Sequence, residues 1–403
     1  MSTVKASKLA LNGGSPIRDA SKAWPTWPIF DDTERKAVNE VLESGKWWYG
    51  DRVERFEREY ADFHDAKYGV TVTSGTTAAE ICMQALGIGA GDEVIVPPYT
   101  FVATAGTVAR MGATPVFVDV DDTWCLDPNL VEAAITTRTK AIMPVHFGSR
   151  VADMDRLNEI AKKHNIVVIE DACHSWGSKW RGKGTGALGL GGVFSFQMSK
   201  NITAGEGGII LSDDEEFAEK CRSITNCGRV KGSAWYHHEV IGTNARITEF
   251  SAALLSAQLS RLEGHTILRE KNAAILNDAI GKIEGITPQP GDDRITRRGY
   301  HLYGMRINPD VFGCSRDAVV KAAIAEGLPC GGGYPEPLYK QPVFWNKKGG
   351  PVDYTKCVCP VTEDMCYRSV MWFPHQHLLA GEADMQDIIR IFTKIKENAS
   401  ELA

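Results

Sequence analysis

From residue 68 onward the chain alternates short apolar runs with helical segments, and this alternation restricts the possible folds more than any other feature. Runs such as EVIV and VVIE are continuously apolar and β-branched, which is typical of parallel strands buried on both faces. Seven runs of this kind occur, at residues 68–73, 93–96, 115–120, 141–145, 166–170, 192–197 and 208–211. The pattern predicts an α/β fold with a seven-stranded, mostly parallel sheet.

A long predicted helix over residues 249–280 follows the last run and leads away from this sheet. Beyond it we expect a strand over 300–307 and helices over 317–327 and 385–399. A chain of 403 residues exceeds the usual size of one core. We therefore predict two domains, which are a large domain with an N-terminal arm over 1–262 and a smaller α+β domain over 263–403.

The composition is that of an ordinary globular protein, with 43% hydrophobic residues and a formal net charge of −6. That charge argues against a nucleic-acid binder. The N-terminus lacks an apolar export segment and no run is long enough to span a membrane, so we expect a cytoplasmic protein. The ten cysteines are scattered, and Cys357 and Cys359 do not have the spacing of zinc ligands. We therefore expect reduced thiols and no metal site.

In open parallel sheets ligands bind beyond the carboxyl ends of the strands, so the residues after each run deserve most weight. After the first run come Ser74, Gly75 and Thr76, which open a helix and present free backbone N–H groups. Such a turn can hold a phosphate, or it can simply cap the helix. Asp171 follows the fifth run, where its carboxylate would pair with a structural partner or with a protonated ring nitrogen.

Lys200 follows the sixth run and precedes a glycine-rich return into the seventh. Most lysines are solvated surface charges, but this position makes Lys200 the best candidate for a nucleophile. A phosphate cradle, a carboxylate and a lysine at the ends of three strands match the needs of pyridoxal 5′-phosphate (PLP). The lysine bonds to the cofactor aldehyde, and the carboxylate keeps the ring nitrogen protonated. The three features together are stronger evidence for a PLP site than any one of them alone.

Several of the same segments resemble the DegT/DnrJ/EryC1/StrS aminotransferases, PLP-dependent enzymes of fold type I that aminate keto sugars and keto cyclitols. The resemblance extends from residue 11 to the C-terminus. The matching motifs are TSGTTA (73–78), PPYTFVATA (97–105), GATPVFVDVD (112–121), VHFGSRVADMD (145–155), VIEDACHSWG (168–177), FSFQMSKNITAGEGG (194–208) and TNARITEFSAALLSAQLSRLE (243–263).

The resemblance implies a role for each matching residue. Lys200 corresponds to the lysine that bonds to PLP, and Asp171 to the partner of the pyridine nitrogen. Gly75 and Thr76 correspond to the phosphate-binding turn, and Ser195 adds a hydroxyl group.

Three further positions follow from the resemblance. Phe101, or alternatively Tyr99, would stack on the cofactor ring. Asn244 would reach the phosphate in the neighbouring subunit's site, which implies a homodimer. His174 departs from the commoner glutamine; it would hydrogen-bond the cofactor's phenolic oxygen, or it is a second-layer histidine with no direct contact.

The family reaction is a ping-pong transamination in which Lys200 moves the proton. The opening LNGGSPIR, the tryptophan pair Trp47 and Trp48 and the FQMSK motif resemble most the subgroup that acts on scyllo-inosose-type cyclitols with L-glutamine, near the amino-hydroxybenzoate synthases. L-Glutamate as donor, nucleotide-linked keto sugars as acceptors, a PLP-dependent dehydratase and a non-catalytic cofactor-binding regulator are the alternatives.

Overall fold

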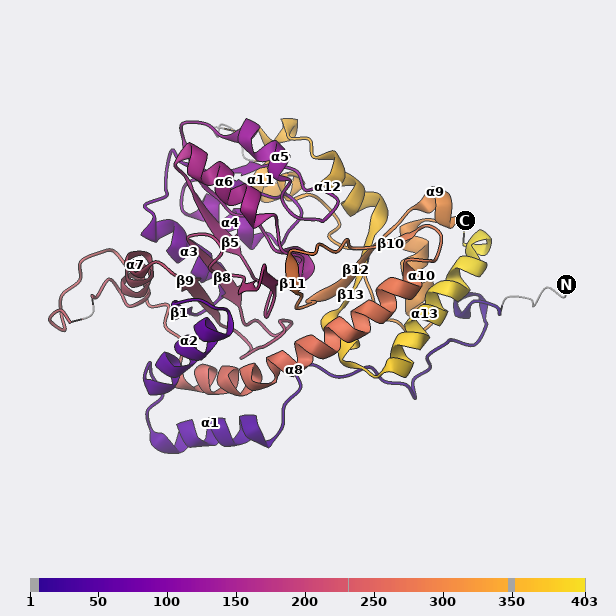
Figure 1. The fold of residues 1–403 in the computed structure, drawn as a ribbon, viewed down its shortest axis with the longest axis horizontal. Helices are drawn as coiled ribbons and strands as arrows, with labels where there is room; N and C mark the ends of the chain where they lie inside the picture. The colour runs from indigo at the N-terminus through magenta and orange to yellow at the C-terminus, as the bar shows by residue number, and fades with distance from the viewer. Residues whose placement is uncertain (1–6, 231, 347–351, 403) are drawn as a thin grey trace.

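A computed structural model describes residues 7–230, 232–346 and 352–402. Its main sheet has seven strands in the order β1-β9-β8-β5-β4-β2-β3 (Figure 1). Strand β9 runs antiparallel to both of its neighbours, and the other pairs are parallel. The strands are β1 (Tyr68–Val72), β2 (Glu93–Val96), β3 (Thr114–Phe117), β4 (Thr139–Ile142), β5 (Val167–Asp171), β8 (Gly191–Ser195) and β9 (Gly208–Ser212). The predicted seven-stranded, mostly parallel sheet is confirmed.

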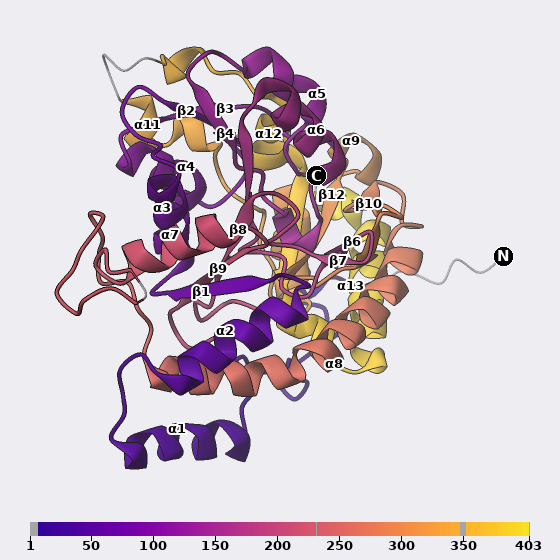
Figure 2. The ribbon, with the colours of Figure 1, turned by 60° about the vertical axis from the view of Figure 1, so that its left-hand side comes forward.

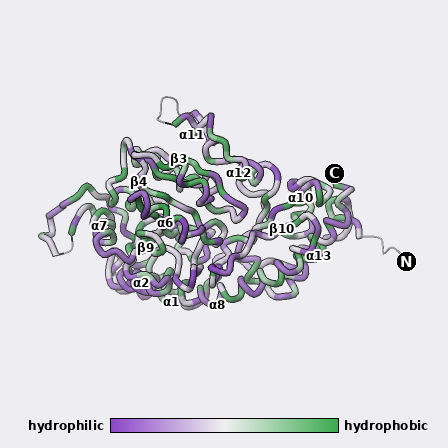
Figure 3. Tube along the Cα trace, turned by 45° about the horizontal axis from the view of Figure 1, so that its top comes forward, coloured by the Kyte–Doolittle hydropathy of each residue, from purple (hydrophilic) through white to green (hydrophobic). Residues whose placement is uncertain are grey.

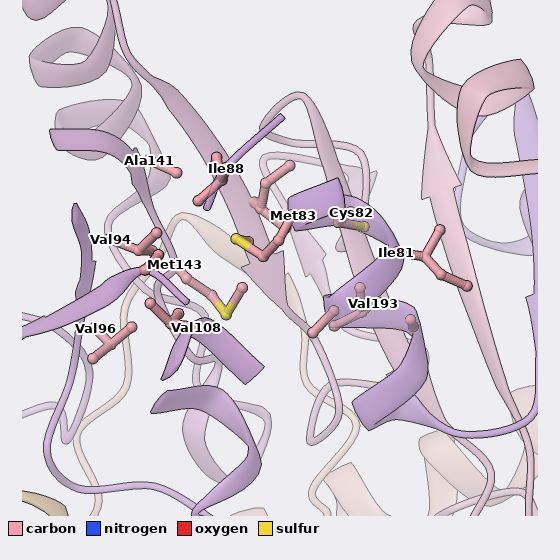
Figure 4. Packing of buried hydrophobic residues seen from close by; sticks show 14 of the residues in the cluster. Ile81, Cys82, Met83, Ile88, Val94, Val96, Val108, Ala141, Met143 and Val193 are labelled. Atoms are coloured by element: carbon pink, nitrogen blue, oxygen red, sulfur yellow. The ribbon is translucent and has the colours of Figure 1, made fainter. Parts of the chain in front are cut away.

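Helices cover both faces of this sheet because successive strand residues point to opposite sides. Val94 and Val96 face a core shared with α3 and α4, where Met83 and Val108 pack (Figure 4). Ile95, between them, faces the core beneath α6 on the other side. The helices of this region are α1 (Asp32–Ser44), α2 (Asp51–Phe63), α3 (Gly75–Ala85), α4 (Ala103–Arg110), α5 (Pro128–Val131), α6 (Met154–His164) and α7 (Glu215–Thr225).

Helix α8 (Glu249–Ile280) is capped by Thr248, whose side chain accepts a hydrogen bond from the Ser251 N–H. It runs from α1 and α2 toward the C-terminal elements (Figure 2). Leu262 packs in the core beside α2, whereas Ala273 and Leu276 pack in a second core. This change of core within one helix agrees with a domain boundary near residue 262, which stays a prediction.

The second core lies under a three-stranded antiparallel sheet of order β10-β12-β13. Sequence patterning predicted β12, α10 and α13 but missed the short edge strand β10 and the strand β13. The elements here are β10 (Ile286–Pro288), β12 (Leu302–Ile307), β13 (Val370–Pro374), α9 (Pro309–Phe312), α10 (Arg316–Ala325) and α13 (Glu382–Glu397). Helices α11 (Pro342–Trp345) and α12 (Pro360–Asp364) pack instead in the cores of the main sheet, through Phe344 and Val361.

A third small sheet joins β6 (Lys179–Trp180) and β7 (Lys183–Gly184) to β11 (Ile295–Arg297). Strands of two or three residues are too short to show periodicity, so the sequence gives no sign of them. Hydrophilic stretches occur along α2, and hydrophobic ones lie around β3 (Figure 3). Among the described residues, no helix is both long and apolar enough to cross a membrane.

Candidate active site

The predicted site residues other than Asn244 converge where β5 and β8, neighbours in the sheet, end. Asp171 is the last residue of β5, and Ser195 is the last residue of β8. Lys200 lies in the loop between β8 and β9, and Gly75 opens α3 directly after β1. The topology therefore brings residues from three distant parts of the chain to one edge of the sheet.

The turn before α3 has the form of an anion site. The Ser74 side chain caps the helix by accepting a hydrogen bond of 3.1 Å from the Thr77 N–H. The first N–H groups of a helix have no partner within it, so those of Gly75 and Thr76 remain available to a ligand. The positive end of the helix dipole adds to their attraction for a phosphate.

Close packing fixes this turn to the strand ends. A Cβ atom at Gly75 would lie 2.8 Å from the Cys173 sulfur and 2.9 Å from the Ser195 Cβ. A Cβ atom at Gly208 would lie 2.5 Å from the carbonyl carbon of Ser74. Glycine is required at both places because the turn rests directly on its neighbours. The contact also shows that Gly75, Ser195 and the segment after Asp171 share one site.

Asp171 is held by two donors. Its Oδ2 accepts a hydrogen bond of 2.7 Å from the Thr104 hydroxyl, and its Oδ1 accepts one of 3.2 Å from the Cys173 N–H. Thr104 is itself within 3.1 Å of the Thr100 hydroxyl. A carboxylate has further lone pairs, so Asp171 can accept an additional donor. Thr104 was missed in the sequence, although it lies in the motif PPYTFVATA that suggested the stacking aromatic.

Lys200 has the environment of a reactive amine. Burial lowers the pKa of its ammonium group, and the nearby Cys173 and Asp171 partly offset this shift. The Nζ atom lies 5.4 Å from the ring centroid of Trp176. Trp176 is anchored by a hydrogen bond of 3.1 Å from its Nε1 to the Ser195 carbonyl. A lowered pKa increases the fraction of neutral, nucleophilic amine at neutral pH.

His174 lies in the same site and is buried. Burial lowers the pKa of its imidazole far below the usual value, and Lys200 lowers it further. The ring lies 5.3 Å from that of Phe147 and 4.5 Å from that of His301. Its Nδ1 is buried and has no hydrogen-bond partner among the described residues. An unpaired buried nitrogen of this kind is suited to a ligand.

The two candidate stacking aromatics differ in accessibility. Tyr99 is 1% exposed and packs against the rings of Phe147, Tyr334 and Trp372. Phe101 is 59% exposed in the single chain. Since Tyr99 is enclosed by core aromatics, only Phe101 of the two is free to stack on a ligand, which favours the preferred prediction.

Asn244 lies apart from the other predicted residues. It forms an isolated β-bridge with Asn226, just after α7, and it is exposed. In the described part of the chain, its side chain makes no hydrogen bond to the other site residues. The described residues between these two asparagines, 227–230 and 232–243, extend away from the body of the chain (Figure 1). This position suits a contact with a second subunit. The dimer itself stays a prediction.

Comparison with known proteins identifies the family of the chain. The family model described as the DegT/DnrJ/EryC1/StrS aminotransferase family matches residues 28–393. A 3-amino-5-hydroxybenzoate synthase of Amycolatopsis mediterranei is 40% identical over 371 residues, covering 90% of this chain and 94% of that protein. An L-glutamine:2-deoxy-scyllo-inosose aminotransferase of Micromonospora echinospora is 39% identical over 419 residues, covering 98% and 99%.

A crystal structure of 3-amino-5-hydroxybenzoic acid synthase superposes with a TM-score of 0.86 at 38% identity, covering 94% of this chain and 99% of that one. The fold is therefore type I among PLP-dependent enzymes, as the resemblance implied. A family match over most of the chain, together with relatives of this identity, identifies the protein as an enzyme of the aminotransferase class. The chain belongs to the DegT/DnrJ/EryC1/StrS aminotransferase family.

Proposed function

We propose that the chain is a PLP-dependent aminotransferase that transfers the amino group of L-glutamine to a keto cyclitol of the scyllo-inosose type. The observation that carries the proposal is the convergence of Lys200, Asp171 and the Gly75–Thr76 turn at one edge of the sheet. Relatives named for L-glutamine and 2-deoxy-scyllo-inosose support the choice of donor and acceptor. L-Glutamate is the alternative donor.

The residues present fit PLP. The free N–H groups at the start of α3 suit its phosphate, with Ser195 close by. The Asp171 carboxylate suits a protonated ring nitrogen, and Phe101 is free to lie against the ring. The unpaired Nδ1 of His174 suits the phenolic oxygen, provided that this nitrogen carries the ring proton. These assignments give the turn, the carboxylate and the imidazole each a partner group on the cofactor.

PLP, when bound, supplies an electron sink for the charge that develops at the α-carbon of the amino donor. Lys200 is the general base in this scheme, because its lowered pKa leaves the Nζ able to take the proton from that carbon. Within the same half-reaction Nζ delivers this proton to the C4′ position of the cofactor, and in the second half-reaction it moves a proton in the reverse direction, from C4′ to the carbon that receives the amino group. Thr104 and the Cys173 N–H hold the Asp171 carboxylate in place, so it needs no rearrangement when it stabilises charge.

An aromatic wall beside His174 favours a ring-shaped acceptor. Tyr334 packs edge to face with Phe147 and with Trp372. Phe147 is fully buried, so the half-buried rings of Tyr334 and Trp372 are the ones that can contact an acceptor. Aromatic faces suit the C–H face of a carbocycle, and the tyrosine hydroxyl and imidazole offer polar contacts for its hydroxyl groups. We further propose a homodimer in which Asn244 reaches the partner's phosphate site, and a cytoplasmic location in aminocyclitol or antibiotic biosynthesis.

The experiment compares acceptors and donors with purified, PLP-loaded enzyme. We expect mass spectrometry to detect an aminocyclitol when 2-deoxy-scyllo-inosose and L-glutamine are supplied, and a slower reaction with nucleotide-linked keto sugars. Product formation with nucleotide-linked keto sugars alone would overturn the choice of acceptor. An aromatic product released without any amino donor would instead favour a dehydratase, a possibility raised by the relative named 3-amino-5-hydroxybenzoate synthase.

A further inference from the structure

The loop that carries Lys200 is held by side chains from distant parts of the chain. We call residues 197–201 the lysine loop. The Nε1–H of Trp27, in the N-terminal arm, donates a hydrogen bond of 3.0 Å to the Met198 carbonyl. The Nε2 of His375, after β13, lies 3.1 Å from the Ser199 carbonyl. Two successive carbonyl groups immediately before Lys200 are thus bound by heterocyclic nitrogens.

The other side of the His375 ring determines which nitrogen carries the proton. Nη2 of Arg269, on α8, lies 3.0 Å from His375 Nδ1. A guanidinium group has only donors, so Nδ1 must be the acceptor. The single ring proton is therefore on Nε2, where it is donated to the Ser199 carbonyl. Arg269 thus fixes the tautomer that His375 needs to hold the lysine loop.

Burying the charged side chain of Arg269 costs stability, which argues for a specific role. It is 0% exposed, and its Nε and Nη1 atoms have no hydrogen-bond partner among the described residues. Burial lowers its pKa to about 9, so the group is still charged at neutral pH. A buried charge without a carboxylate partner costs stability. The interaction that this buried charge makes is the hydrogen bond to His375.

Several titratable groups surround the His375 ring. Arg269 and His265 face it from α8, and His377 lies on the same 3-10 helix (His375–Leu379). The His301 ring stacks at 5.8 Å. Burial, followed by the charge of Arg269, lowers the pKa of His375 well below its usual value. A neutral ring is what the hydrogen-bond pattern requires, so the electrostatics and the geometry agree.

We propose that Arg269 and His375 are positioning residues that hold the lysine loop so that the Lys200 amine points into the site. The inference rests on the proposed role of Lys200. Loss of the His375 donor frees the Ser199 carbonyl, and the loop then leaves Lys200 more mobile and more exposed to water. Lys200 would then be a less effective base while the binding groups of the site stay in place.

The test uses two substitutions of similar chemistry but different reach. In His375→Gln the amide nitrogen extends to the place of Nε2 and retains a donor for Ser199. In His375→Asn the amide faces Arg269 but is too short to reach Ser199. Arg269→Met removes the group that sets the tautomer. His377→Leu is the matched control, because it removes a buried imidazole from the same short helix without touching the lysine loop.

The first readout is chemical modification of Lys200 in the full-length, cofactor-free chain with acetic anhydride, mapped by mass spectrometry and normalised to the exposed Lys321. At a pH above the labelling midpoint of every variant, where the amine is neutral throughout, we expect His375→Asn and Arg269→Met to increase Lys200 labelling about fivefold, the effect of one lost hydrogen bond. The pH midpoint of labelling should move upward, toward that of an ordinary lysine. The charged and titratable groups near Lys200, which are Asp171, Cys173, His174 and His301, are unchanged in these variants, so the shift reports the exposure of the amine. His375→Gln and His377→Leu should label like the natural chain.

The second readout is steady-state kinetics of the PLP-loaded enzyme. His375→Asn should lower kcat with little change in KM, and His375→Gln should recover most of it. Equal labelling in the asparagine, glutamine and leucine variants would overturn the proposal, even where their thermal stabilities differ. The labelling requires no transamination, so a wrong substrate assignment leaves this result unaffected. A wrong assignment of Lys200 itself would be revealed separately, by mapping of the cofactor attachment site.

Discussion

The hydroxyl of Thr104 donates a hydrogen bond of 2.7 Å to Oδ2 of Asp171, so the helix after β2 orients the carboxylate at the end of β5. The two residues are 67 positions apart in the sequence. Their contact links two strand ends of the sheet into one site. It also identifies Thr104 as a positioning residue for the group that we expect to face the cofactor.

Replacing Thr104 by valine tests this contact. Thr104→Val keeps the side-chain shape but leaves Oδ2 without its donor, so we expect kcat/KM to fall about five- to tenfold, which corresponds to about 1 kcal/mol. Thr107→Val is the control, since Thr107 lies on the same helix, is equally buried and bonds only to a backbone carbonyl. Equal losses in the two variants would contradict a specific role for Thr104.

A methyl group at Gly75 should disturb the phosphate turn. Because its Cβ would approach the Cys173 sulfur and the Ser195 Cβ within 3 Å, Gly75→Ala must displace the turn. We expect PLP affinity, measured by fluorescence titration of the cofactor-free chain, to fall at least tenfold, or about 1.4 kcal/mol. Gly106→Ala on α4 meets nothing within 4 Å and should bind PLP normally. Unchanged affinity in Gly75→Ala would show that this turn does not hold the phosphate.

His64 should make the stability of the chain depend on pH. Burial lowers the pKa of its fully buried ring to about 3, whereas the unfolded value is about 6.5. Between these two values the unfolded chain binds a proton that the folded chain does not. His64 therefore lowers the free energy of unfolding as pH falls, by up to about 1.4 kcal/mol per pH unit.

In His64→Gln that contribution is removed, so the free energy of unfolding should fall less steeply with acidification. Urea unfolding between about pH 6.5 and pH 4.5 measures the slope directly. The glutamine variant is expected to be less stable near neutrality, because the ring lies within hydrogen-bond distance of the Thr185 carbonyl. The prediction concerns the slope alone, and an identical slope in both proteins would contradict it.

Mixing two inactive variants tests the proposed dimer. If each site combines Lys200 of one chain with Asn244 of the other, a mixed dimer of Lys200→Ala and Asn244→Ala has one intact site. Refolding the two together in equal amounts should restore about one quarter of the natural activity, because half of the dimers are mixed and half of their sites are intact. Activity no greater than the sum of the separate variants would count against a shared site.

Much of the candidate site was predictable because its residues follow buried strands directly. Asp171 and Gly75 each come next to an apolar run that fixes their place at the sheet edge. Lys200 is further from its strand, but the glycine-rich return shows that the loop is short. Local pattern and sheet topology were sufficient to place these three at one edge of the sheet, whereas their roles toward a cofactor stay predictions.

The residues that support the site were not predictable in this way. Thr104 lies on a helix, Trp27 in an irregular arm and His375 in a short turn of 3-10 helix. Each belongs to a residue type that usually packs or caps, and only the three-dimensional fold brings it to its target. Arg269 likewise looks like one surface charge among others on a long helix, although it is fully buried.

The most direct test of the account is the chemical identity of the residue that binds PLP. Borohydride reduction of the PLP-loaded enzyme, followed by peptide mass mapping, should find a pyridoxyl group on Lys200, and Lys200→Ala should lose both this label and turnover. A pyridoxyl group on another lysine, or normal turnover by Lys200→Ala, would contradict the central claim.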